Sequence, residues 1–150
     1  MKSTKLIELL RAFKEKEFLS LENFVASPYF NKNENIIKLF SILKNYYPDF
    51  ENEELEKEII FGKIFGRKKY DDEKMRTLIS ALMKLIKKYL VQIELEQRKW
   101  ESDLYLLAQL SIKNQEALLE YEHKKAEAYV EENLYKERDY YYAKYSQGIE

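Results

Sequence analysis

The single histidine of the chain, His123, lies three residues after Glu120. A Glu-x-x-His spacing places both side chains on one side of a helix, as in carboxylate-bridged di-iron bundles, but such a centre needs a second Glu-x-x-His and two further inward glutamates. The chain contains one histidine and no cysteine, so neither this centre nor a Cys-ligated zinc site can be completed within it. We therefore interpret His123 as an exposed helical residue beside Lys124 and Lys125, and we expect no metal and no cofactor.

Adjacent carboxylates are common in the sequence, at positions 53–54, 71–72 and 131–132. Acid–base catalysis needs a carboxylate that is desolvated in a cleft, whereas these pairs lie in strongly charged stretches that favour water. The sequence also contains no Gly-x-Ser-x-Gly elbow and no glycine-rich phosphate loop. We expect that the protein is not an enzyme, and we assign no catalytic residue.

The strongest charge asymmetry lies between Lys63 and Lys88. This segment contains nine basic and three acidic residues and has a formal charge of +6. Cations beside an aromatic residue, Tyr70, are typical of nucleic-acid contacts. The candidate phosphate contacts are Arg67, Lys68, Lys69, Arg76, Lys84 and Lys87. The segment 49–58 carries a formal charge of −5, so intramolecular pairing on a solvated helix face is the favoured interpretation.

Tyrosine is abundant, with 13 residues, and several lie near the C-terminus. The run 140–142 is the most informative part, because consecutive helical residues point about 100° apart and one neighbour cannot cover all three rings. Tyrosine is enriched at interfaces, since it combines an apolar ring with a hydroxyl group. The predicted interaction surface consists of Tyr135, Tyr140, Tyr141, Tyr142 and Tyr145.

Composition predicts that helices carry these residues. The 150 residues suffice for one ordinary domain, and 45% are hydrophobic, which is enough to form a core. Three glycines and two prolines provide few of the turns that a β-sandwich or barrel needs, so we expect an all-α fold. Charge-free stretches reach only about ten residues, roughly half of a bilayer span, and the N-terminal apolar stretch is interrupted by Glu8 and Arg11. We expect a cytoplasmic protein with no membrane partner.

Apolar residues at three- and four-residue spacing predict about eight helices with short loops. The approximate ranges are 4–16, 20–26, 33–46, the acidic 49–54 region to Gly66, 71–96, 100–112, 115–132 and 134–145. Between 97 and 102 the pattern lapses, so 72–112 forms either one bent helix or two. We expect Tyr29 and Phe30, in the loop between the predicted helices 20–26 and 33–46, to point into the core.

Two regions are predicted along the chain. Residues 1–96 form an irregular helical bundle, and 97–150 form a repeat-like extension packed on it, with the character of an α-solenoid. The boundary is soft, and a single domain is the alternative.

Several segments resemble the N-terminal part of an uncharacterised helical protein family of Bacteroidota-type bacteria. They are Phe24-Val25-Ala26-Ser27-Pro28-Tyr29-Phe30-Asn31-Lys32-Asn33, Ile64-Phe65-Gly66 with Tyr70 and Asp71, the helix 78–90, and Asp139-Tyr140-Tyr141-Tyr142. The Ser-Pro-Tyr-Phe-Asn segment is the most specific. The resemblance spans the whole chain, implies that the chain is a fragment of a longer protein, and brings no activity, cofactor or catalytic residue.

The sequence thus favours a non-enzymatic helical protein–protein interaction or scaffold module. Its expected partner is a protein: a second copy, further C-terminal helices or another chain. The alternative is a helical nucleic-acid-binding domain that uses the basic segment 63–88.

Overall fold

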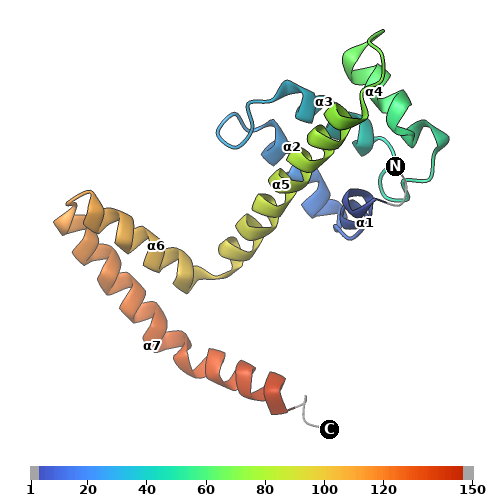
Figure 1. Ribbon diagram of the computed structural model, residues 1–150. Coiled ribbons are helices and arrows are strands. Elements are labelled where there is room, and N and C mark those ends of the chain that lie inside the picture. The colour runs from blue at the N-terminus through green and yellow to red at the C-terminus, as the bar shows by residue number, and fades with distance from the viewer. Residues whose placement is uncertain (1–3, 147–150) are drawn as a thin grey trace. The chain divides into compact units, whose positions relative to one another are not determined.

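The computed structural model describes the backbone of residues 4–146 and the side chains of residues 4–133 and Lys136. This part of the chain is all-α and contains seven α-helices and one short 3₁₀ helix (Figure 1). They are α1 (Lys5–Arg11), α2 (Glu15–Ala26), α3 (Glu34–Lys44), η1 (Glu53–Leu55), α4 (Lys57–Phe65), α5 (Asp72–Gln97), α6 (Lys99–Ile112) and α7 (Glu116–Ser146). The predicted all-α multi-helix bundle is confirmed.

Packing divides the chain into two units, one that ends at Gln92 and one that begins at Ile93. The dividing point lies within α5, five residues before that helix ends at Gln97. The predicted domains 1–96 and 97–150 stay a prediction, because a division by internal contacts does not establish that either part folds alone.

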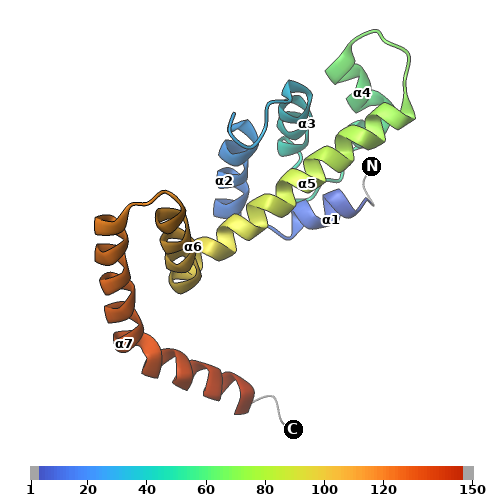
Figure 2. The ribbon, with the colours of Figure 1, turned by 60° about the vertical axis from the view of Figure 1, so that its left-hand side comes forward.

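In the first unit, one face of α5 supplies the centre of the core. Met75, Leu78, Leu82, Ile86 and Tyr89 recur every three or four residues and are all buried. Figures 1 and 2 both show this part of α5 running past α1, α2, α3 and α4. The spacing seen in the sequence therefore identifies the core face of this helix correctly.

An aromatic cluster joins α2 to α3 and to the turn that follows α3. Phe18 of α2 stacks on Tyr47 at a centroid distance of 4.0 Å and meets Phe40 of α3 at 5.5 Å. Phe50 closes the cluster with its ring edge toward Tyr47 at 6.2 Å. Offset and edge-to-face rings add stabilisation beyond the area they bury.

The predicted helix 4–16 is wrong at its C-terminal end, because the chain breaks between Arg11 and Glu15. The break turns Phe13 into the core, and the Tyr47 hydroxyl donates to the Phe13 carbonyl at 2.8 Å. This hydrogen bond satisfies a carbonyl group that the break leaves outside a helix. The next helix is consequently longer than expected, with 12 residues.

The loop after α2 corrects a second expectation. Tyr29 is 84% exposed and does not turn inward, whereas Phe30 is 38% exposed and stacks on Phe24 at 4.3 Å. The buried residue of the loop is Asn31, whose side chain donates to the Val25 carbonyl and accepts from the Asn33 amide, both at 2.9 Å. A polar side chain replaces the expected apolar anchor because it satisfies the backbone groups of the turn.

Helix ends in the first unit follow capping chemistry. Asn33 accepts from the Asn35 amide at the start of α3, and Asp71 accepts from the Lys74 amide at the start of α5. Gly66 ends α4 with a φ of 71°, a conformation that glycine adopts without strain. The helix predicted to start in the acidic segment starts instead at Lys57, after the separate turn η1.

The range 72–112 proves to be two helices, α5 and α6, that are separated at Arg98. In the second unit, α6 and α7 form a helical hairpin (Figure 2). Ser102 donates to the Leu95 carbonyl at 2.9 Å, which binds one of the last carbonyl groups of α5. The predicted break at Asn133 is wrong, because α7 is helical from Glu116 to Ser146. The Asn133 side chain donates to the Tyr129 carbonyl, one turn back, while the backbone remains helical.

Replacement of Asn31 by Ala should lower the free energy of unfolding by about 1–3 kcal/mol, because the Val25 carbonyl loses its partner in a buried place. Urea denaturation followed by circular dichroism measures the change. Lys32→Ala, the adjacent exposed position, is the control and should stay within about 0.5 kcal/mol. Equal stability of the two variants would contradict the role given to Asn31.

Candidate functional sites

The basic segment 63–88 is only partly neutralised within the fold. Lys63 Nζ lies 2.7 Å from Glu54 Oε2, and Tyr46 donates to the same carboxylate. These hydrogen bonds raise the pKa of Lys63 and lower the pKa of Glu54. The predicted pairing between the acidic and basic segments is therefore present at this position.

A second charged group surrounds Asp72 at the start of α5. Arg76 Nε lies 2.8 Å from Asp72 Oδ2, and Lys57 Nζ lies 3.8 Å from Asp72 Oδ1. The Tyr70 hydroxyl, which donates to Asp72 at 2.8 Å, is the main cause that lowers the pKa of this carboxyl group. Desolvation and this hydrogen bond raise the pKa of Tyr70 to about 12.

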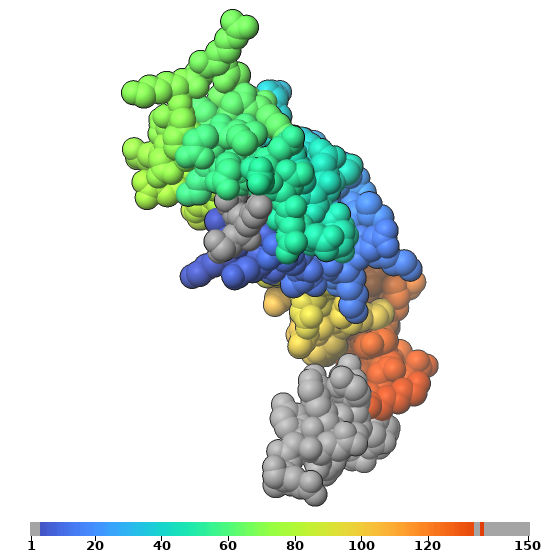
Figure 3. Space-filling model, turned by 90° about the vertical axis from the view of Figure 1, so that its right-hand side faces the viewer, coloured from blue at the N-terminus to red at the C-terminus, as the bar shows by residue number. Residues whose placement is uncertain are grey.

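Most of the predicted phosphate contacts are exposed cations without an acidic partner. Arg67, Lys68 and Lys69 lie in the loop between α4 and α5, whose long side chains project from the surface in Figure 3 (green, at the top). Lys84 and Lys87 are exposed on α5, and within residues 4–133 no ion pair involves any of these five residues. Arg76 is the exception, because Asp72 binds it.

The outer side of α5 forms a basic strip. Arg76, Lys84 and Lys87 lie within about 80° of one another around the helix, on the side opposite the buried face. No acidic residue occurs from 74 to 93. Arg76 lies one turn after Asp72, beside the loop, whereas Lys84 lies roughly 18 Å farther along the helix from Asp72, so the strip extends from the loop along α5.

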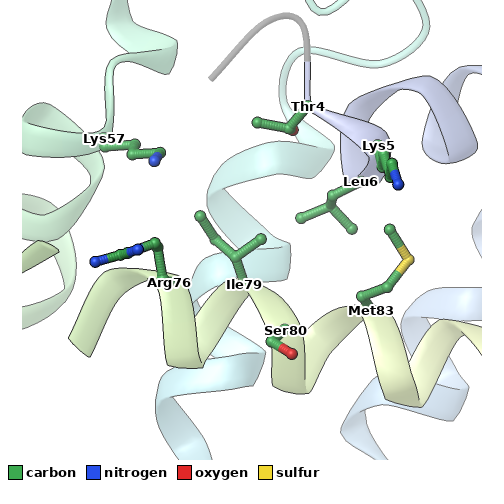
Figure 4. Close-up of a pocket in the computed structure, with 8 residues that line it drawn as sticks. All are labelled: Thr4, Lys5, Leu6, Lys57, Arg76, Ile79, Ser80 and Met83. Carbon is green, nitrogen blue, oxygen red and sulfur yellow. The ribbon is translucent and has the colours of Figure 1, made fainter. Parts of the chain in front are cut away.

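The structure also reveals a pocket of about 300 Å³ between α1, α4 and α5 in the first unit (Figure 4). Three cations line it: Lys57 and Arg76 at one side and Lys5 at the other, with Leu6 and Ile79 between them. Leu6 is buried and Ile79 is half-buried. The pocket therefore combines an apolar wall with cationic edges.

The remaining residues that line the pocket are also partly apolar and partly polar. Met83 adds a half-buried, adaptable thioether to the apolar wall, and Thr4 and Ser80 bring hydroxyl groups. The Thr4 hydroxyl already accepts from the Ile7 amide at 3.4 Å and keeps its own proton for donation. Sequence reasoning found Arg76 but missed Lys5 and Lys57, because they are far apart in the chain and form no motif.

The second unit exposes a different kind of surface. Leu104, Tyr105 and Leu106 of α6 are 44%, 63% and 42% exposed, and because they are consecutive they point to three different sides of the helix. Ile112 is 71% exposed at the end of α6. Within the described side chains from Ile93 onward, the buried hydrophobic residues are Leu110 and Ala126.

The predicted tyrosine surface lies on the last turns of α7, since Tyr135, Tyr140, Tyr141, Tyr142 and Tyr145 are within the helical range Glu116–Ser146. Their side chains are outside the described residues, so this surface stays a prediction. Residues 104–106 are also consecutive large apolar residues in a helix. The sequence reasoning applied this pattern to the tyrosines alone and therefore missed the exposed surface at 104–106.

The Glu120 and His123 pair does not form a shared site in the structure. Glu120 binds Lys124 at 2.9 Å, and His123 Nδ1 lies 3.6 Å from Glu127 Oε2. No group of three or more His, Cys, Asp or Glu residues in the described part of the chain is placed to hold a metal ion.

The fold and these surfaces define an all-α protein with a cationic pocket and strip in the first unit and exposed apolar helices in the second. Comparisons with protein-family models, with curated proteins and with solved structures find no match to this chain. Among the described helices, none has the length and apolarity that crossing a bilayer requires.

Replacement of Tyr70 by Phe should raise the pKa of the Asp72 carboxyl group, because the hydrogen bond that contributes most to its lowering is removed. Carbon-13 NMR titration of the Asp72 carboxyl group measures the change. Since the ionised form is favoured in the fold, the interaction stabilises the protein above the ordinary Asp pKa and is lost as the pH falls through the lowered value.

The control for this titration is Tyr29→Phe, which removes an exposed hydroxyl in a distant loop and should leave the Asp72 pKa unchanged. An identical Asp72 titration in Tyr70→Phe and the parent protein would show that the hydroxyl does not hold this carboxylate.

Proposed function

We propose that this chain is a non-enzymatic protein–protein interaction module and that the exposed apolar sides of α6 and α7 are its docking surface. The observation that carries the proposal is the exposure of Leu104, Tyr105 and Leu106 on three sides of α6. A helix that is apolar around its circumference is normally covered on more than one side, and α7 covers one side within this unit. Leu118 and Tyr121 of α7 are exposed apolar side chains as well, at 47% and 59%.

The charge of the second unit indicates the chemistry of the partner. From Ile93 to the last residue the sequence has 8 basic and 13 acidic residues, a formal charge of −5, whereas residues 1–92 have 18 basic and 14 acidic residues, a charge of +4. Complementary charge guides association and fixes orientation. The partner that fits best is an amphipathic helix whose apolar face is flanked by Lys and Arg.

The described ionisable groups support a non-enzymatic role. Among the described side chains, Asn31 is the buried polar residue, and no Asp, Glu, His, Lys or Arg is buried. Asp, Glu and Lys generally need a pKa shifted by desolvation to act as an acid or base at neutral pH, and the described ones are not desolvated in this way.

A designed peptide tests the docking surface. A labelled 20-residue amphipathic helix with a Leu face and Lys on its polar face should bind the full chain, and fluorescence anisotropy measures the affinity. Ile112→Lys should weaken binding about tenfold or more, because it places a charge in the apolar surface and repels the basic partner. A matched peptide with Glu in place of Lys should bind more weakly.

The matched control is Ile59→Lys, which makes the same replacement at a partly exposed position of α4 in the first unit and should leave peptide binding unchanged. Equal binding of the Lys and Glu peptides, or equal loss in both variants, would overturn the proposal. Light scattering of the free chain identifies the case in which a second copy occupies the surface.

Nucleic-acid binding is the second candidate function, and the unpaired cations of the first unit favour it. Arg67, Lys68 and Lys69 in the loop and Lys84 and Lys87 on α5 have no acidic partner within residues 4–133, so their charge is available to phosphate groups. Phosphate contacts release counterions, which makes such binding depend steeply on salt.

Anisotropy with single-stranded and duplex oligonucleotides at several salt concentrations tests this function. For single strands, Lys84→Gln with Lys87→Gln should reduce the slope of log affinity against log salt by about 1.4, or about 0.7 for each contact. Lys32→Gln with Lys38→Gln, two exposed lysines elsewhere in the first unit, should leave the slope unchanged. Absence of binding at low salt would exclude this function.

A further inference from the structure

We propose that the pocket between α1, α4 and α5 binds a small organic anion with an apolar body. The anionic group, a carboxylate or a monophosphate, contacts the sides of Lys57 and Arg76 that Asp72 leaves open, and the body lies against Ile79 and Met83. The site is separate from the proposed docking surface, because all of its lining residues belong to the first unit.

The balance of charge around the pocket favours an anion. Three cations line it, Lys5, Lys57 and Arg76, and the single carboxylate of Asp72 lies near two of them, Arg76 at 2.8 Å and Lys57 at 3.8 Å, so one negative charge stands against three positive ones. Asp72 binds Arg76 through Nε at 2.8 Å, and within residues 4–133 no hydrogen bond occupies the terminal guanidinium nitrogens. The carboxylate thus orients the guanidinium group and leaves its terminal N–H groups available for a bound oxygen atom.

The wall of the pocket favours an apolar body over a bare ion. Leu6 is 1% exposed, and Ile79 and Met83 are half-buried. Leu6 is already removed from water, so the apolar surface that remains open in the pocket belongs to Ile79 and Met83. An inorganic ion would leave that surface in contact with water, whereas an alkyl or aryl group would cover it. Small-molecule sites generally combine a mostly apolar lining with a few polar groups that fix the orientation of the ligand.

The size of the pocket limits the ligand. A volume of about 300 Å³ is at the lower end of the range for small-molecule sites, about 300–1,000 Å³, and fits a small ligand. An eight-carbon carboxylate such as octanoate matches this limit and has the required division into a charged end and an apolar body.

Titration of the full chain with sodium octanoate, followed by amide NMR, tests the proposal. We expect saturable shifts at residues 4–6, 57, 76, 79, 80 and 83, which line the pocket. A parallel titration with octyl phosphate identifies the anionic group. If octanoate and octyl phosphate both give saturable shifts, the site accepts anions in general; if only octanoate does, the site is specific for carboxylates. Inorganic phosphate and 1-octanol supply the two halves of the ligand separately, and each should bind at least tenfold more weakly.

Three substitutions locate the binding groups. Arg76→Gln and Lys57→Gln should each raise the octanoate Kd about tenfold, which is the effect of losing one charged hydrogen bond. Met83→Gln should also weaken binding, because it places an amide in the apolar wall. Lys84→Gln removes a neighbouring exposed cation that does not line the pocket and should leave the Kd unchanged.

Three results would overturn the proposal. The first is an unchanged octanoate Kd in the variant that combines Arg76→Gln and Lys57→Gln. The second is equal affinity for octanoate and 1-octanol. The third is a set of shifts confined to α6 and α7, which would mean that octanoate binds the exposed apolar helices. Since the pocket and the docking surface are tested with different variants, failure of either proposal leaves the other to be decided by its own experiment.

Discussion

Burial of one face of α5 is the packing constraint on which the first unit depends. Met75, Leu82 and Ile86 are fully buried at intervals that keep them on one side of the helix, and the helices α1 to α4 surround that side. Because a helix that buries one face presents its opposite face to water, the same constraint places Lys84 and Lys87 on the surface. The core and the cationic strip are therefore two consequences of one arrangement.

Residues at the edge of the buried face create the cationic pocket. Ile79 and Met83 are half-buried because they lie between the core side and the outer side of α5, and Leu6 of α1 packs beside them. Lys57 joins the same pocket because α4 begins near the start of α5 and Asp72 attracts both cations. Apolar contact and unneutralised charge thus occur together at this edge.

The second unit has a different balance of buried and exposed surface. Its two helices leave Leu104, Tyr105 and Leu106 partly in water and bury Leu110 and Ala126. In a two-helix hairpin each helix buries one face against the other. A helix with apolar residues on several sides therefore keeps some of them exposed to water. Its formal charge of −5 is the reason that a basic partner is proposed for this surface.

Periodicity in the sequence by itself determined the all-α class and the core face of α5, because both follow from local spacing. For residues 72–112 it left one bent helix and two helices as alternatives, and the structure shows two. Periodicity did not predict the break after Arg11, where the core takes up Phe13 and Tyr47 binds its carbonyl. Nor did it predict the pocket, whose cations come from segments as distant as Lys5 and Lys57. Tertiary structure decided these features, because long-range packing determines which separated residues meet and which side chains stay in water.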